Sequence, residues 1–125
     1  MAGNSWQQPV AGEPSVGTPH VHYAQLYTGD PADTNWHSID LTAQVPVGTK
    51  AIDIEASIQE TAGVSRLLSI SNASGGTAFR RARTISSQQG YCGGLMPISA
   101  DYKIWWYVDN ADVDNVTINM VAYYI

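Results

Sequence analysis

Apolar and polar side chains alternate along most of the chain after residue 19. The clearest case is Lys50–Glu60, where one face carries Ile52, Ile54, Ala56 and Ile58 and the other carries Asp53, Glu55, Ser57 and Gln59. Alternation with a period of two residues is typical of a half-buried antiparallel strand. The same pattern predicts further strands at Val21–Tyr27, Trp36–Leu41, Val64–Ser71, Ala78–Ser86, Tyr102–Asp109 and Val116–Ile125.

Turn-forming residues separate these segments. They lie at Gly29–Pro31, Pro46–Gly48, Asn72–Gly76, Gln88–Gly94 and Asp109–Asn115. No window shows a helical period with capping residues. Seven or so short strands at this spacing predict an all-β fold, an antiparallel β-sandwich or jelly roll, over residues 20–125.

Residues 1–19 have a different composition, with Pro9, Pro14 and Pro19, three glycines and a single aromatic residue, Trp6. Proline at this density disfavours both helix and central strand, so we expect an extended Pro/Gly-rich N-terminal arm. A disordered tail is the alternative. Trp6 and Val10 are unusual in a purely solvating tail, which favours an arm that anchors the protein to a partner.

Two predicted strands carry large apolar side chains on both faces. Trp105 and Tyr107 oppose the apolar set of Tyr102–Asp109, and Tyr123 does the same near the end of Val116–Ile125. A small sandwich has one interior, so the second face needs another cover. We expect that cover to be another copy of the chain, with Arg81 and Arg83 in the same interface. Cover by the arm or by long loops is the alternative.

Composition narrows the class of protein. The 125 residues suit one domain, and the low charged fraction of 14% argues against a coiled coil or solvated helical bundle. Six Lys and Arg against eleven Asp and Glu argue against general nucleic-acid binding. No apolar stretch approaches the ~20 residues of a membrane span, so we expect no membrane insertion. The first residues do not resemble a signal peptide, and Cys92 has no second cysteine to pair with, so we expect assembly in a cytoplasm.

His20 and His22 lie two residues apart, which places both imidazoles on one face of an extended strand. This is the geometry of a two-ligand metal clamp, and three copies around a threefold axis would supply six nitrogens. Two exposed or hydrogen-bonded histidines are the alternative.

Catalytic signatures are absent from the sequence. Cys92 lies in the predicted glycine-rich loop, and no local signature ties it to His37 or to the other histidines. There is no nucleophile elbow, phosphate loop or zinc-protease motif. We therefore expect a protein that is not an enzyme and has no cofactor.

All six cations lie between Lys50 and Lys103, and Arg81 and Arg83 share a strand face with Phe79. A small anion or carbohydrate contact is one interpretation. We favour pairing of the arginines with Asp53, Glu55 or Glu60, across strands or across a subunit boundary. A sugar platform formed by Trp105 with Asn110 and Asp112 is a further alternative to burial of the aromatic residues.

The run Trp36-His37-Ser38-Ile39-Asp40-Leu41, followed by Val45-Pro46-Val47-Gly48-Thr49-Lys50-Ala51, resembles a recurring element of virion fibre and decoration proteins of tailed bacteriophages. The closing Asp114–Ile118 and Tyr123–Ile125 are similar to the final strand of the same knobs, although Ala122 or Tyr123 stands where those knobs often carry glycine. The resemblance implies a trimeric β-sandwich displayed on the virion surface and transfers no catalytic residue.

We therefore expect a structural virion protein of a bacteriophage, either a capsid decoration (cement) protein or a short head fibre, attached to the capsid as a homotrimer. Its partners would be itself and the major capsid protein or a neighbouring virion protein. The alternative is a carbohydrate- or receptor-binding knob of a tail fibre, which would contact a host surface glycan. A tail-fibre knob normally follows a long shaft, so we place the head position first.

Overall fold

The computed structural model describes residues 18–61, 63–85 and 88–125, and these form eight β-strands. The strands are β1 (Pro19–Gly29), β2 (His37–Asp40), β3 (Ala51–Gln59), β4 (Leu67–Ser71), β5 (Arg80–Arg83), β6 (Gly90–Pro97), β7 (Lys103–Val108) and β8 (Asn115–Tyr124). The predicted all-β class is confirmed. Across these ranges, no helix is long and apolar enough to span a membrane.

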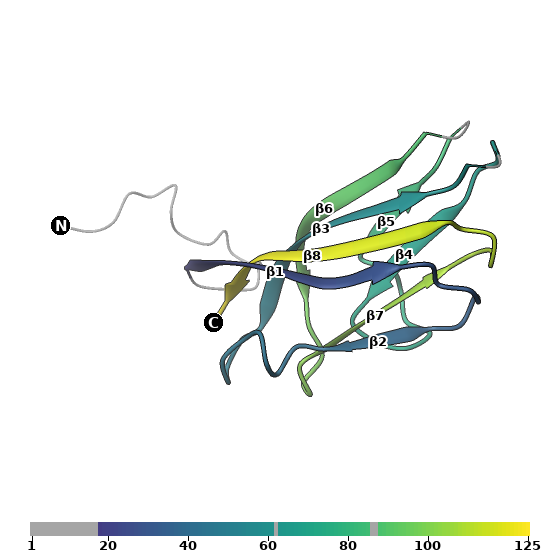
Figure 1. Cartoon of the computed structure of the whole chain (residues 1–125). Helices are drawn as coiled ribbons and strands as arrows, with labels where there is room; N and C mark the ends of the chain where they lie inside the picture. The colour runs from purple at the N-terminus through teal and green to yellow at the C-terminus, as the bar shows by residue number, and fades with distance from the viewer. Residues whose placement is uncertain (1–17, 62, 86–87) are drawn as a thin grey trace.

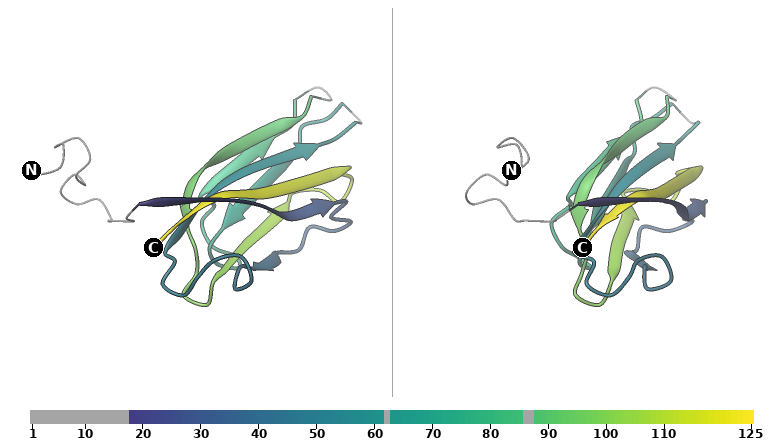
Figure 2. Two further views of the ribbon diagram at one scale, coloured as in Figure 1. Left: turned by 60° about the vertical axis from the view of Figure 1, so that its left-hand side comes forward. Right: turned by 90° about the vertical axis from the view of Figure 1, so that its left-hand side faces the viewer.

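The strands form two four-stranded antiparallel sheets packed face to face (Figures 1 and 2). Sheet A has the order β1-β8-β3-β6, and sheet B has the order β2-β7-β4-β5. Every connection except β4 to β5 crosses from one sheet to the other. Eight strands in this order form a jelly roll. Of the two predicted architectures, a simple β-sandwich and a jelly roll, the chain therefore adopts the second.

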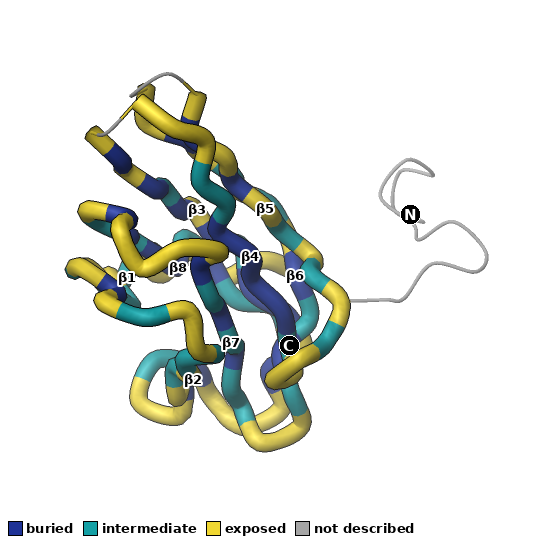
Figure 3. The backbone as a smooth tube through the Cα atoms, turned by 90° about the vertical axis from the view of Figure 1, so that its right-hand side faces the viewer, coloured by how far each residue is buried: buried dark blue, intermediate teal, exposed yellow. Residues whose placement is uncertain are grey.

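The core lies between the sheets and is built from the inward-facing residues that the alternation predicted. Figure 3 shows the corresponding change between buried and less buried residues along the strands. Sheet A contributes mainly from β3 and β8, and sheet B from β4 and β7. Fully buried side chains include Ile52, Ile54, Ile58, Val116, Ile118 and Met120 from sheet A and Leu68, Ile70, Ile104, Trp106 and Val108 from sheet B.

The prediction of a loop at Gln88–Gly94 was wrong, because most of this segment belongs to β6. This strand pairs with β3 from Ala51↔Pro97 to Ile58↔Gly90. Its glycines are required by close backbone approach: a Cβ on Gly90 would lie 2.3 Å from the carbonyl oxygen of Arg83, and one on Gly93 would lie 2.9 Å from that of Ile54. Glycine is depleted in strands on average, so its abundance here concealed the strand from the sequence pattern.

The open edge of the sandwich, between β1 and β2, is filled by aromatic rings. The Trp106 ring lies between two partners, Tyr27 of β1 and His37 of β2, each with its ring centroid 4.6 Å away. His37 Nε2 also lies 2.7 Å from Asp33 Oδ1. His37 therefore has a structural role at this edge.

The predicted arm lies almost entirely outside the described residues, and so do Trp6, Pro9, Val10 and Pro14. The described chain enters the sandwich at Pro19, where β1 begins opposite Tyr124 of β8. The start of β1 and the C-terminus therefore lie at the same end of the molecule, as Figure 2 shows. We call this the β1 end.

Candidate functional site

The outer face of sheet B gathers four of the five residues predicted to form a subunit interface. Alternation along β7 turns Trp105 and Tyr107 outward, because Ile104, Trp106 and Val108 fill the core. On the neighbouring strands, Ser69 of β4 pairs with Tyr107 on one side and with Arg81 of β5 on the other. Trp105 pairs with Ser71 and Arg83 with Leu67 in the same way. We call Trp36, Trp105, Tyr107, Arg81 and Arg83 the aromatic-arginine face.

This face is already partly closed within one chain. Trp36 packs on Tyr107 with ring centroids 4.5 Å apart. Ser69 and Ser71 occupy outward positions of β4 and are nevertheless almost fully buried. Ser71 is enclosed by the following turn, since its hydroxyl donates to the Thr77 carbonyl at 2.8 Å. Trp105 and Tyr107 remain half-buried. The two rings of β7 therefore keep part of their surface open to solvent.

Tyr123, the fifth predicted interface residue, belongs to β8 in sheet A. Its ring stacks on His20, with centroids 5.0 Å apart and planes 9° apart, and meets the edge of His22 at 6.3 Å. The two histidines share a face, as predicted, and in the single chain both contact this tyrosine ring. Within residues 18–61, 63–85 and 88–125, no group of three or more His, Cys, Asp or Glu side chains is arranged to hold a metal. A site shared between copies stays a prediction.

Of the three acids expected to pair with arginines, Glu60 does so among the described residues, and its partner is Arg66. Arg66 binds Asp112 with two hydrogen bonds of 2.5 and 2.7 Å and lies 3.9 Å from Glu60 Oε2. These bonds hold the pKa of Asp112 below its ordinary value. Asp53 instead accepts a bond from the Tyr124 hydroxyl at 3.4 Å.

The three arginines of β5 differ in their contacts. Arg80 points inward across the edge of the sandwich and donates to the Leu95 carbonyl of β6. Arg83 donates to Ser65 Oγ at 2.9 Å. Arg81 has neither a hydrogen bond nor an ion pair to any described residue. Its charge is therefore unpaired within the described part of the chain.

The suggested sugar platform at Trp105 is not supported by the hydrogen bonds around it. The Asp112 carboxylate is bound by Arg66, and Asn110 Oδ1 accepts a hydrogen bond from the Asp112 backbone. Both polar groups thus stabilise the connection between β7 and β8, beyond the end of the strand that carries Trp105.

Cys92 lies in β6 opposite Ala56, packed against the core, and not in a loop as predicted. Burial raises the pKa of its thiol, although Arg80 acts in the opposite direction. A raised pKa keeps the thiol protonated near neutral pH, which is unfavourable for a nucleophile.

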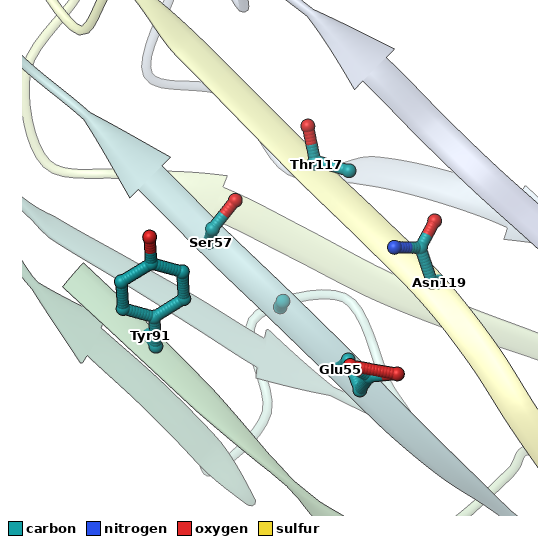
Figure 4. Close-up of a pocket in the computed structure, with 6 residues that line it drawn as sticks. Glu55, Ser57, Tyr91, Thr117 and Asn119 are labelled. Atoms are coloured by element: carbon teal, nitrogen blue, oxygen red, sulfur yellow. The ribbon is translucent and has the colours of Figure 1, made fainter. Parts of the chain in front are cut away.

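The outer face of sheet A carries polar side chains along the middle of β3 and β8, and it contains a hollow of about 110 Å³. Figure 4 shows Glu55 and Ser57 of β3 between Tyr91 of β6 and the pair Thr117 and Asn119 of β8. These residues are far apart in the sequence, and the strand order β8-β3-β6 brings them together. We call this group the sheet A hollow.

The β1 end of the sandwich exposes apolar side chains. Val21 and Tyr23 of β1 are 86% and 62% exposed, Val47 is 89% exposed and Ile125 is 47% exposed. The turn at Gly48 lies against Ile125. The Gly48 backbone N–H donates a hydrogen bond of 2.9 Å to the Tyr102 hydroxyl oxygen, which holds the turn in place. Depressions of about 70 and 420 Å³ flank this turn.

Comparisons with known proteins give little further information. No protein-family model matches the chain, and no curated protein matches it. Among solved structures, the chain is similar to the coat protein of Tobacco streak virus, with 11% sequence identity, a TM-score of 0.39 and coverage of 90% of each chain. At that TM-score the likeness carries no inference about function. The molecular features that bear on function are therefore the jelly-roll topology, the two sheet faces and the β1 end.

Proposed function

We propose that this chain is a structural protein of a tailed-bacteriophage virion, a capsid decoration protein or short head fibre that acts as a homotrimer. The observation that carries the proposal is the aromatic-arginine face on the outside of an otherwise complete jelly roll. Jelly rolls with this two-sheet architecture include viral capsid domains. The resemblance of the Trp36–Leu41 and Val45–Ala51 runs to phage fibre and decoration proteins supports the same role.

The aromatic-arginine face has the composition of a subunit interface. Interfaces are enriched in Trp, Tyr and Arg and depleted in Lys and Glu. Trp105 and Tyr107 offer large rings that are half-buried before any association. Arg81, without a described partner in its own chain, supplies a charge that a carboxylate of the next copy would pair with.

The β1 end is the part that we assign to attachment. Exposed Val21, Val47 and Ile125 surround the point where residues 1–17 join β1. An apolar end with depressions beside it suits contact with the major capsid protein or a neighbouring virion protein. The arm with Trp6, Pro9, Val10 and Pro14 would extend that contact, and the protein would reside in virions assembled in the host cytoplasm.

A receptor-binding knob of a tail fibre is the second candidate. The sheet A hollow favours it, because polar side chains around one exposed aromatic ring suit recognition of a host glycan. A metal site formed by His20 and His22 from several copies of the chain is compatible with either function. It would require both imidazole rings to move away from Tyr123.

The attachment proposal is tested by sedimenting purified protein with virus particles that lack it. We expect the full chain to sediment with the particles. A variant without residues 1–17 leaves β1 intact, so it should keep its β-sheet circular dichroism spectrum but stay in solution. Val47→Asp should weaken attachment, whereas Val64→Asp, at the opposite end and 40% exposed, should not. Normal attachment of the truncated chain would rule out the anchoring role of the arm.

A further inference from the structure

The sheet A hollow is formed by a gap in the side-chain pattern of β6. On the outer face of this strand, Tyr91, Gly93 and Leu95 lie opposite Ser57, Glu55 and Asp53 of β3. Gly93 has no side chain to fill the space in front of Glu55. A Cβ at this position would lie 2.9 Å from the Ile54 carbonyl oxygen, so the backbone opposes any larger residue. The space beside Tyr91 is therefore fixed by the packing of the strands.

Free hydrogen-bonding groups line this space. The Glu55 carboxylate, the Ser57 hydroxyl and the Asn119 amide form no hydrogen bond or ion pair with another described residue. Thr117 is engaged, since its hydroxyl bonds to Thr28 and accepts from Asn115, both at 3.1 Å. Strands hold the three free groups at fixed spacings, so a ligand would meet them with little ordering cost.

Tyr91 supplies the wall of the hollow on β6. Tyr91 is 71% exposed, and its hydroxyl donates a hydrogen bond of 2.9 Å to Gln89 Oε1. That hydrogen bond restrains one end of the ring, while the ring itself stays open to a ligand. An exposed aromatic ring offers an apolar surface next to the polar groups of β3 and β8.

The chemistry of the lining selects among ligand classes. A phosphate or carboxylate ligand would be repelled by Glu55 and by the net charge of −5. A divalent cation would find one carboxylate and no group of three ligands in the described part of the chain. An apolar ligand would leave Glu55 and Asn119 desolvated without partners, which is costly.

A neutral ligand with adjacent hydroxyls and one apolar face satisfies all of these groups. Two neighbouring hydroxyls can donate to the two oxygens of Glu55, and the Asn119 amide can both donate and accept. The C–H face of a sugar ring can lie on Tyr91. We propose that the sheet A hollow binds a single hexopyranose residue of a glycan.

This assignment names the ligand of the second candidate function and requires only that sheet A stays exposed. The hollow of about 110 Å³ is smaller than a typical ligand pocket and holds one ring at most. We therefore expect a dissociation constant on the order of 1 mM for one sugar, with useful strength coming from several copies in one assembly.

The test is saturation-transfer NMR on the full chain with the methyl glycosides of glucose, galactose, mannose and N-acetylglucosamine. We expect at least one of them to receive saturation at its ring protons. Glu55→Gln keeps the side-chain shape and should raise the dissociation constant about tenfold by removing a charged acceptor. Tyr91→Ala should do the same by removing the ring.

Asp101→Asn and Phe79→Ala are the matched controls, an exposed carboxylate and an exposed aromatic residue outside the hollow, and both should leave binding unchanged. Should Tyr91→Ala fail to fold, the isosteric Glu55→Gln decides alone. The proposal is overturned if none of the four glycosides receives saturation, or if transfer is undiminished in Glu55→Gln. Neither result alters particle attachment, so this inference can fail while the attachment proposal stands.

Discussion

Arg66 shows how single residues stabilise the end of the sandwich opposite the β1 end. Its guanidinium joins Asp112, in the connection between β7 and β8, to the neighbourhood of Glu60, which is 1% exposed at the end of β3. The sequence indicated an arginine paired with a nearby acid and named Glu60 among three choices. It gave no sign of Asp112, because that residue is brought close only by the crossing of strands between the sheets.

The lowered pKa of Asp112 makes part of the stability dependent on pH. Its folded pKa lies below the ordinary value of about 3.9, so its contribution is complete above that value and is lost as pH falls through the folded pKa. We expect Asp112→Asn to lower the thermal midpoint by a few degrees near neutral pH, with the difference from wild type shrinking in strong acid.

Thermal unfolding followed by circular dichroism at about pH 7, 4 and 2.5 checks this expectation. Asp101→Asn is the control, because its carboxylate is 68% exposed and its cation, Lys103, is 3.9 Å away. A deficit in Asp112→Asn that is the same at all three pH values would show that the ion pair with Arg66 does not carry the effect.

At the scale of elements, the sequence predicted strands where alternation was regular and failed where backbone packing decided the residue type. β3 was predicted within one residue at each end, because Ile52, Ile54 and Ile58 repeat without interruption. β6 was missed, because Gly90 and Gly93 are dictated by backbones of β5 and β3 that the sequence pattern does not reveal.

The sequence showed which face of a strand each side chain occupies more readily than it showed which strands lie side by side. Alternation correctly turned Trp105 and Tyr107 away from the core, but it could not show that Tyr123 belongs to the other sheet. The sheet A hollow was missed for the same reason. Its residues come from β3, β6 and β8, and only the strand order brings these together.

The contact between β5 and β6 closes one edge of the sandwich, and Arg80 is its main polar link. The side chain donates across the edge to the Leu95 carbonyl and also to the Phe79 carbonyl at 2.9 Å. We expect Arg80→Leu to lower the free energy of unfolding by about 1–2 kcal/mol, since a charged hydrogen bond to the opposite sheet is lost.

Arg81→Leu is the matched control on the opposite face of the same strand. Because Arg81 has no described intrachain partner, we expect a change within about 0.5 kcal/mol. Urea unfolding of both variants at low protein concentration makes the comparison, since association would otherwise add to stability. Equal losses in the two variants would contradict the assigned role of Arg80.

For the whole molecule, the jelly roll presents two outer faces of different chemistry. Sheet B carries half-buried aromatic rings and unengaged Arg81, which suit contact with another copy. Sheet A carries free polar groups around the hollow, which suit contact with water or a sugar. The low charged fraction of 14% fits outer faces built largely from aromatic and uncharged polar side chains.

Self-association through sheet B is the central claim, and sedimentation equilibrium tests it most directly. At micromolar concentration we expect the wild-type protein to have three times the 13.5 kDa mass of one chain. The double variant Trp105→Ser, Tyr107→Ser should have the mass of a single chain. It should remain folded, because both side chains lie outside the core. A wild-type chain that stays monomeric, or a double variant that is still trimeric, would contradict the claim.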